Sequence, residues 1–299
     1  MLAFITTLRH PQNSADYGRV ESLLEDTLAS LTQQTCEDYI VIVVGVRRPA
    51  FPLPDRTVFV EVDFPAPSDR KGPRTGAASV IWDKGTKNAI GLIAARDFGP
   101  EYVMFVDADD FVHRELAEFV HARPGHAGWV VKRGLMYSRR RNAYKRLRKF
   151  YRFCGTSFII PLEAYEVPTH LTVSATQQEI AGAFGERLEH VLEHGWAFDW
   201  WRKHGRLLEP LPFAGAVYHL QNGENHSDND LFGPALPYRA HLYRDYAIRP
   251  SRRPTSTLWA SIGPSAFKPD LRVLRPAFLQ PKSYLQNYSP PGSPVVPSR

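Results

Sequence analysis

The sequence predicts an α/β fold, built on a single Rossmann-like mixed sheet with helices on its faces. Short apolar runs rich in valine and isoleucine alternate with longer segments in which apolar residues recur every three or four positions. One of these runs ends abruptly in acidic residues, at the place where open sheets of this class bind ligands. The composition agrees, because 299 residues of which 43% are hydrophobic can bury a substantial core.

The first 120 residues carry the clearest pattern. Strands are expected at residues 2–8, 39–46, 57–62 and 102–106, and the second is continuously apolar, as in a strand buried on both faces. A helix follows the first strand, with one apolar face that is formed by Val20, Leu23, Leu24, Thr27, Leu28 and Leu31. Residues 76–97 are also helical in pattern. Strand, helix, strand, strand, helix, strand is the order of an α/β nucleotide-binding half.

The pattern is looser beyond that point. Helices are expected at residues 115–121, 180–192 and 197–204, and strands at 129–132, 155–160, 207–211 and 215–220. We expect these elements to build a second half on the same sheet. Ten of the 25 prolines lie in the last 50 residues, so residues 251–299 are predicted to form a Pro-rich tail that wraps the surface or is disordered.

Composition excludes several classes of protein. The longest apolar run, residues 39–46, is far shorter than the ~18 to 20 residues that span a bilayer. The first ten residues lack the leading positive charge and the cleavage site of a signal peptide, so a cytoplasmic chain is expected. Two cysteines exclude a disulfide scaffold and a four-cysteine zinc site, and they fit a reducing compartment.

The net charge of +6 comes from one segment. Residues 132–152 contain ten lysines and arginines and no acid, which leaves the rest of the chain negative. Such a segment attracts phosphate in nucleic acid, in anionic lipid headgroups or in a phosphorylated substrate, and the alternative is a solvated helix face. Aromatic residues interleave the cations, as they do both in nucleic-acid sites and in membrane-interface helices: Tyr137, Tyr144, Phe150 and Tyr151.

Acidic residues stand where the strand at 102–106 ends. Asp107 and Asp109 leave the strand two positions apart, which lets two carboxylates converge on one cation. Hard oxygen ligands suit Mg²⁺ or Mn²⁺ bridging a diphosphate. The alternative is that Asp109 or Asp110 caps the helix expected at Glu115.

A lysine-rich segment precedes these acids. Residues 84–92 read Lys-Gly-Thr-Lys-Asn-Ala-Ile-Gly-Leu, and they open a helix whose amide end and two lysines could hold a phosphate. Together with the strand-borne Asp-x-Asp, this segment resembles the family 2 glycosyltransferases of the GT-A fold. The resemblance is good over residues 2–120 and weaker to residue 220. Residues 153–158 also look like the acceptor-side strand of such enzymes.

The resemblance implies a metal-dependent, inverting glycosyltransferase of cell-surface polysaccharide or glycolipid synthesis. Residues 1–250 would form its domain, with 1–120 as the nucleotide-binding half and 121–250 as the acceptor half. Its donor would be a nucleotide-sugar, UDP-linked by default, and its acceptor a saccharide or a lipid-linked one. The residues implied for the donor are Thr7, Arg9, Asp63, Lys84, Lys87, Asn88 and Asp107, with Asp107 also beside Asp109 at the metal. Taken singly, Arg9 and Asp63 have the alternative of being ordinary loop residues, and Lys84 and Lys87 that of being exposed helix charges.

The chain departs from the family in two places. No acid follows the second strand, and no Glu-Asp pair opens a helix to supply the base that deprotonates the acceptor. The candidates for that base are Glu186, then Asp199, then His190. The alternative for Glu186 and His190 is a solvated helix face, and for Asp199 a place near the start of its helix. His226 or His219 would complete the metal shell, although a lone histidine is more often structural.

Two other classes of function compete with this interpretation. A non-enzymatic module would use the basic segment to bind a polyanion or a membrane surface. A sugar-phosphate nucleotidyltransferase also has strand-end acids, but this chain lacks the glycine-rich loop after its first strand. For the enzyme, residues 132–152 predict peripheral contact with an anionic membrane at the inner face, and nucleic acid is not an expected partner.

Overall fold

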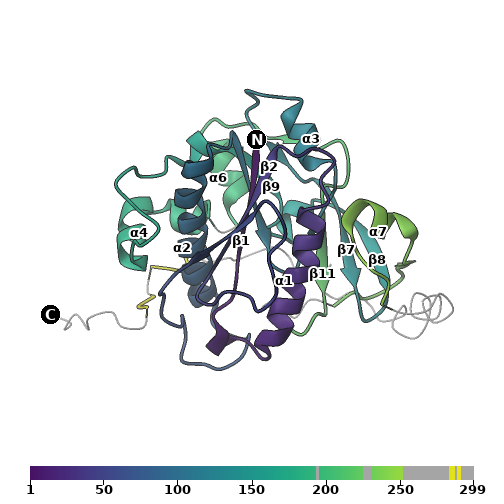
Figure 1. Ribbon diagram of the computed structural model, residues 1–299, viewed down its shortest axis with the longest axis horizontal. Helices are drawn as coiled ribbons and strands as arrows, with labels where there is room; N and C mark the ends of the chain where they lie inside the picture. The colour runs from purple at the N-terminus through teal and green to yellow at the C-terminus, as the bar shows by residue number, and fades with distance from the viewer. Residues whose placement is uncertain (193–194, 225–229, 252–282, 287, 291–299) are drawn as a thin grey trace.

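The computed structural model describes residues 1–192, 195–224, 230–251, 283–286 and 288–290. Its centre is a seven-stranded mixed sheet with the strand order β10-β6-β9-β4-β1-β2-β3 (Figure 1). These strands are β1 (Leu2–Thr7), β2 (Tyr39–Gly45), β3 (Thr57–Glu61), β4 (Tyr102–Asp107), β6 (Trp129–Val130), β9 (Phe158–Pro161) and β10 (Glu209–Pro210). Strands β1 to β4 are mutually parallel, whereas β9 runs antiparallel to both β4 and β6.

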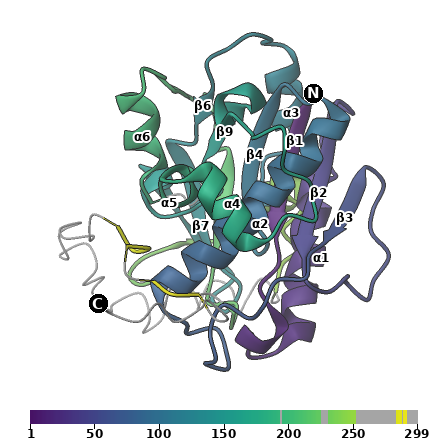
Figure 2. The same ribbon diagram turned by 90° about the vertical axis from the view of Figure 1, so that its left-hand side faces the viewer.

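Helices cover both faces of this sheet (Figures 1 and 2). Helices α1 (Tyr17–Leu31) and α3 (Leu116–His121) share one core with Leu2 and Phe4 of β1. On the other face, Ala3 and Ile5 pack with α2 (Ala77–Ala95), α4 (Gln177–Phe184), α5 (Arg187–His190) and α6 (Ala197–Lys203). The alternation of β1 side chains between two cores is the period-two pattern of a strand buried on both faces. The predicted α/β fold with a flanked mixed sheet is confirmed.

A second sheet of five strands lies beside the first, and it is where the structure differs most from the expected layout. Its order is β12-β8-β7-β11-β5. The strands are β5 (Phe111–Val112), β7 (Arg133–Ser138), β8 (Ala143–Arg148), β11 (Ala216–Leu220) and β12 (Leu236–Pro237). Helix α7 (Ala240–Tyr246) packs on this sheet. The expectation that residues beyond 120 extend the same sheet is therefore wrong for these strands.

The basic segment forms the β7–β8 hairpin and not a helix, so the solvated-helix alternative is also wrong. Residues 145–148 of β8 alternate between partly buried and exposed positions, as expected of a strand. The helix expected over residues 180–192 is two helices, because Gly185 takes a left-handed φ of +53° between α4 and α5. The remaining short helical turns are η1 (Pro11–Asn13), η2 (Arg96–Phe98), η3 (Phe150–Arg152) and η4 (Leu162–Tyr165).

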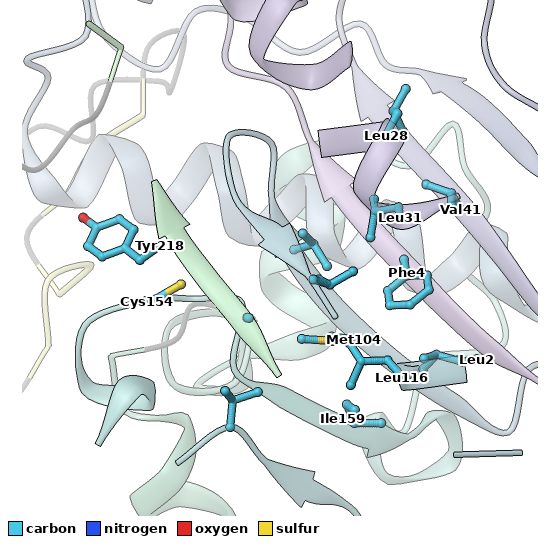
Figure 3. Close-up of a cluster of buried hydrophobic side chains, with 14 of the residues drawn as sticks. Leu2, Phe4, Leu28, Leu31, Val41, Met104, Leu116, Cys154, Ile159 and Tyr218 are labelled. Atoms are coloured by element: carbon cyan, nitrogen blue, oxygen red, sulfur yellow. The ribbon is translucent and has the colours of Figure 1, made fainter. Parts of the chain in front are cut away.

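One continuous core joins the two sheets. Figure 3 shows part of it, with Phe4 and Val41 of the central sheet beside Leu31 of α1. The same core includes Met104 of β4 and Tyr218 of β11, which belongs to the second sheet. In the part of the chain that is described, no helix is long and apolar enough to cross a membrane.

The described residues of the C-terminal segment lie against α2 and α5. The buried Glu189 carboxylate accepts hydrogen bonds from the Ser283 hydroxyl, at 2.6 Å, and from the Tyr284 backbone N–H. Tyr288 donates to the Pro67 carbonyl at 2.8 Å, and its ring centroid lies 6.0 Å from that of Trp82. The rest of the predicted Pro-rich tail, apart from Ser251, lies outside the described residues.

Helix α2 approaches β1 closely at Gly91. A Cβ atom added there would lie 2.3 Å from Cγ2 of Ile5, whereas one added at Gly182 of α4 would meet nothing within 4 Å. Gly91→Ala should therefore destabilise the protein by about 1–3 kcal/mol through overpacking, despite the better helix propensity of alanine. Gly182→Ala should be neutral or stabilising by up to about 1 kcal/mol. Urea denaturation of both variants checks this, and equal effects would contradict it.

Candidate active site

Asp107 and Lys84 form an ion pair at the carboxyl edge of the central sheet. Asp107 ends β4 and lies in register with Thr7, which ends β1. Its Oδ1 atom is 2.5 Å from Nζ of Lys84 in α2. A Cβ added to Gly155 would lie 2.9 Å from that Nζ and 3.0 Å from Oδ2 of Asp107. Glycine at this position therefore leaves room for the ion pair and for a ligand beside it.

Asp109 lies in the turn that follows, and it is half-buried. Its Oδ2 atom accepts a hydrogen bond of 2.7 Å from Nδ2 of Asn222. Burial raises the pKa of Asp109 to about 6, and the charge of Asp107 acts in the same direction. Arg9 and Lys84 oppose that rise. The site thus concentrates two carboxylates and two cations at the end of β4.

Asp110 is the buried support of this turn. Its side chain accepts hydrogen bonds from Sγ of Cys154 (2.8 Å), Oγ1 of Thr156 (2.7 Å) and the backbone N–H of His219 (3.1 Å). Burial raises its pKa well above the usual range. Glu115 occupies the N-cap position of α3 without a side-chain capping bond, so the alternative that Asp109 or Asp110 caps this helix is wrong. Nothing in the sequence Asp-Ala-Asp-Asp of residues 107–110 indicates which aspartate points inward.

His219 is fully buried beneath the same turn. Its Nδ1 atom lies 3.2 Å from the Asp109 carbonyl oxygen, and burial lowers its pKa to about 3, so the ring is neutral. His219 therefore contacts the main chain of the acidic turn. His226, the other histidine expected at the metal, lies outside the described residues.

Glu224 was missed in the sequence because it stands in a polar loop without a pattern. Its buried carboxylate accepts hydrogen bonds from the backbone N–H groups of Ala15 and Asp16 at 2.8–3.2 Å. It also lies 3.7 Å from Nη1 of Arg9. Glu224 thus ties the segment after β11 to the loop after β1, and Asn222 ties the same segment to the turn after β4. Arg9 is thereby held at the edge where it was expected.

Two of the expected donor contacts are corrected by the structure. Helix α2 begins at Ala77, so its amide end is two turns before Lys84 and does not lie under the lysines. Lys87 is fully buried, and its Nζ donates to the Leu8 carbonyl at 2.8 Å and to Oδ2 of Asp83 at 2.7 Å. Asn88 is buried as well and donates to the Leu192 carbonyl at 2.7 Å. Both side chains are therefore engaged by groups of the protein itself.

Asp63 is exposed just beyond β3, at the same edge of the sheet. Strands β1 and β2 separate β3 from β4, so the structure does not bring Asp63 together with Asp107. Among the donor residues expected from the sequence, the structure gathers Thr7, Arg9, Lys84 and Asp107 at the ends of β1 and β4.

The candidates for a catalytic base lie on α5 and α6. Glu186 is exposed at the start of α5, and Asp199 forms a surface ion pair of 3.0 Å with Arg202. His190 stacks on Trp200, with ring centroids 5.4 Å apart. None of the three candidates forms a hydrogen bond or ion pair with the acids after β4. Helix α5 does pack against α2 at Gly85, next to Lys84.

Asp107 and Asp109 fit a hard divalent cation, because both offer carboxylate oxygens at the open edge. Ligand atoms of Asp107, Asp110 and Cys154 also lie within 4.8 Å of one another. That second set fits poorly, because Asp110 already accepts three hydrogen bonds and burial raises the pKa of the Cys154 thiol. A protonated thiol is a weak ligand.

Comparisons with known proteins give similar solved structures only. No family model and no curated protein matches the sequence. The crystal structure of S. aureus TarS is similar at a TM-score of 0.40 and 12% identity, over 73% of this chain and 36% of that one. S. aureus TarS 1-349 in complex with UDP-GlcNAc has a TM-score of 0.38 and 13% identity, over 77% of this chain and 62% of that one. Mouse xyloside xylosyltransferase 1 has a TM-score of 0.31 and 12% identity, over 70% of this chain and 84% of that one. The chain thus spans about a third of the full TarS chain and less than two thirds of its 1-349 form.

Thr156 hydrogen-bonds to both Asp107 and Asp110, so its substitution is a direct test of this site. Its hydroxyl donates to Asp110 and accepts from the backbone N–H of Asp107 at 3.0 Å. Thr156→Val should lower the free energy of unfolding by about 2–3 kcal/mol, because two buried groups lose a partner. Thr156→Ser keeps the hydroxyl and should cost about 1 kcal/mol. Chemical denaturation measures both, and a serine variant as unstable as the valine variant would contradict the hydrogen-bonding role.

Proposed function

We propose that this chain is a glycosyltransferase that binds a nucleotide-sugar at the carboxyl edge of its central sheet. The observation that carries the proposal is the convergence of Lys84, Asp107, Asp109 and Gly155 at the ends of β1 and β4. Ligands of open α/β sheets bind at this edge. UDP is the default nucleotide, and the acceptor is a saccharide or a lipid-linked saccharide of cell-surface polysaccharide or glycolipid synthesis.

The charges at the edge suit a diphosphate. Lys84 and Arg9 are 20% and 23% exposed, so a ligand can reach both side chains. Asp107 and Asp109 would hold Mn²⁺ or Mg²⁺, which would neutralise charge on the departing diphosphate. Lys84 is poised to act on the same group, because its ammonium already lies against Asp107 and can contact a phosphate from there.

The proposed reaction is a direct displacement with inversion. The acceptor hydroxyl attacks the anomeric carbon, the bond from that carbon to the diphosphate oxygen breaks, and a base takes the hydroxyl proton. The diphosphate leaves with the electron pair of the broken bond. Glu186 is our first candidate for the base, ahead of Asp199 and His190, because α5 packs beside Lys84. The donor site and the base are separate parts of this proposal.

Donor binding is tested by thermal shift and by calorimetry with UDP-, GDP-, CMP- and dTDP-sugars, with and without Mn²⁺. One nucleotide should raise the melting temperature in the presence of metal, because a ligand of the native state stabilises it by mass action. Asp109→Asn should weaken that binding by about tenfold or more, which corresponds to ~1.4 kcal/mol.

Asp97→Asn is the matched control for Asp109→Asn. Asp97 is exposed in η2, before β4 and therefore at the opposite edge of the sheet. Its substitution should leave nucleotide affinity unchanged. No response to any nucleotide, with or without metal, would overturn the donor site and favour the non-enzymatic binding module.

A further inference from the structure

Five exposed cations gather at the open end of the β7–β8 hairpin, and we call them the cationic rim: Lys132, Arg133, Arg148, Lys149 and Arg152. Backbone contacts hold them together. Arg133 and Arg148 are paired across the two strands, and the N–H of Lys149 donates to the Lys132 carbonyl at 2.9 Å. The N–H of Arg152 donates to the Lys149 carbonyl at 3.0 Å. None of the five forms an ion pair with a residue that the structure describes.

This arrangement is costly for the isolated protein. Like charges directly opposite each other across two strands repel, as Arg133 and Arg148 do here. The sequence supplies no acid between residues 119 and 162 to relieve them. An anionic partner at this surface would remove the repulsion, so the charge pattern is complementary to a negatively charged surface.

The rim lies at the same edge of the sheet as the donor site. Because β9 is antiparallel to both β4 and β6, strands β4 and β6 run in the same direction. Lys132 follows β6 just as Asp107 ends β4, so both stand at the carboxyl edge. Arg152 is also only three residues before Gly155, which faces Asp107. The cationic rim therefore lies next to the proposed donor site at this edge of the sheet.

The aromatic residues of the segment decide between a nucleic acid and a membrane. Tyr137, Tyr144 and Phe150 are buried, and Tyr151 packs on Phe198 with ring centroids 4.5 Å apart. A single-stranded nucleic acid needs exposed rings on which successive bases stack, and these rings are turned inward. Phe153 is the exception, since it is 49% exposed immediately after Arg152. One apolar ring among cations is the pattern of a surface that enters the headgroup region of a bilayer.

We propose that the cationic rim and Phe153 dock the protein onto an anionic lipid membrane. The cations would lie at the headgroups while the Phe153 ring enters the boundary with the acyl chains. In the cytoplasm this would be the inner face of the membrane. Docking would turn the carboxyl edge of the central sheet, and the donor site with it, toward the bilayer. This orientation favours a lipid-linked acceptor, and the inference about the acceptor rests on the proposed function.

The docking is tested by sedimentation of the full chain with vesicles of phosphatidylcholine, alone or with about 30 mol % phosphatidylglycerol. Binding should require the anionic lipid and weaken as salt rises. Each cation at such a surface strengthens binding about fivefold, so Arg148→Gln with Arg152→Gln should weaken it about 25-fold. Phe153→Ser should weaken it several-fold more without changing the salt dependence.

Arg56→Gln with Arg123→Gln removes the same charge from the opposite edge and is the matched control. Both residues are exposed, the first before β3 and the second before β6. The control should bind vesicles like the unmodified chain. An equal loss in the control, or heparin or RNA binding that persists while vesicles are not bound, would overturn the proposal.

Measuring the melting temperature and the nucleotide affinity of the double variant separates a loss of membrane docking from a loss of folding or of donor binding. Arg148→Gln removes one member of a repelling pair, so the melting temperature of the double variant should not fall. Its nucleotide affinity should also be unchanged, because neither arginine contacts the donor residues. A chain that binds vesicles but no nucleotide would retain the docking surface while the proposed function fails.

Discussion

The buried carboxylate of Asp110 is the constraint on which the rest of the site depends. It joins three pieces of chain that are distant in sequence: the turn after β4, the loop before β9 and strand β11 of the second sheet. A buried carboxylate without hydrogen-bond partners destabilises the folded protein, so the positions of these three segments depend on one another. Thr156, one of the partners of Asp110, also accepts from the backbone N–H of Asp107, so the same set of bonds fixes the turn that carries Asp107 and Asp109.

Most of the central sheet could be predicted from the sequence, because strands buried on both faces read as continuous apolar runs. Of the second sheet, only β11 was predicted as a strand, and its place in a separate sheet was not predicted. Strand β8 alternates Arg146 and Arg148 with partly buried neighbours, and its identity depends on pairing with β7, which no local pattern reveals. In the sequence, Gly185 is a glycine within a helical pattern, and the pattern does not reveal that its φ is left-handed. The break between α4 and α5 therefore could not be predicted.

The location of the proposed donor site could be predicted from the sequence, but only some of its residues could. Acids at a strand end identify the edge, since parallel strands place their carboxyl ends together. Lys84 and Lys87 are equivalent in sequence, yet one faces Asp107 and the other is buried against Asp83. The two lysines lie on the same side of α2, one turn apart, so their difference follows from what faces each turn: Asp107 beside Lys84, and the Leu8 carbonyl beside Lys87. Glu224 and Asn222 reach the site only through the tertiary fold.

The contact of Glu189 with Ser283 and Tyr284 has a consequence for the order in which the protein assembles. Domains fold from the N-terminus while the chain is still being synthesised. The carboxylate of Glu189 in α5 finds its partners only some 95 residues later in the chain. The packing of residues 283–286 and 288 on α2 and α5 therefore forms only after Lys84, Asp107 and Asp109 have all been synthesised.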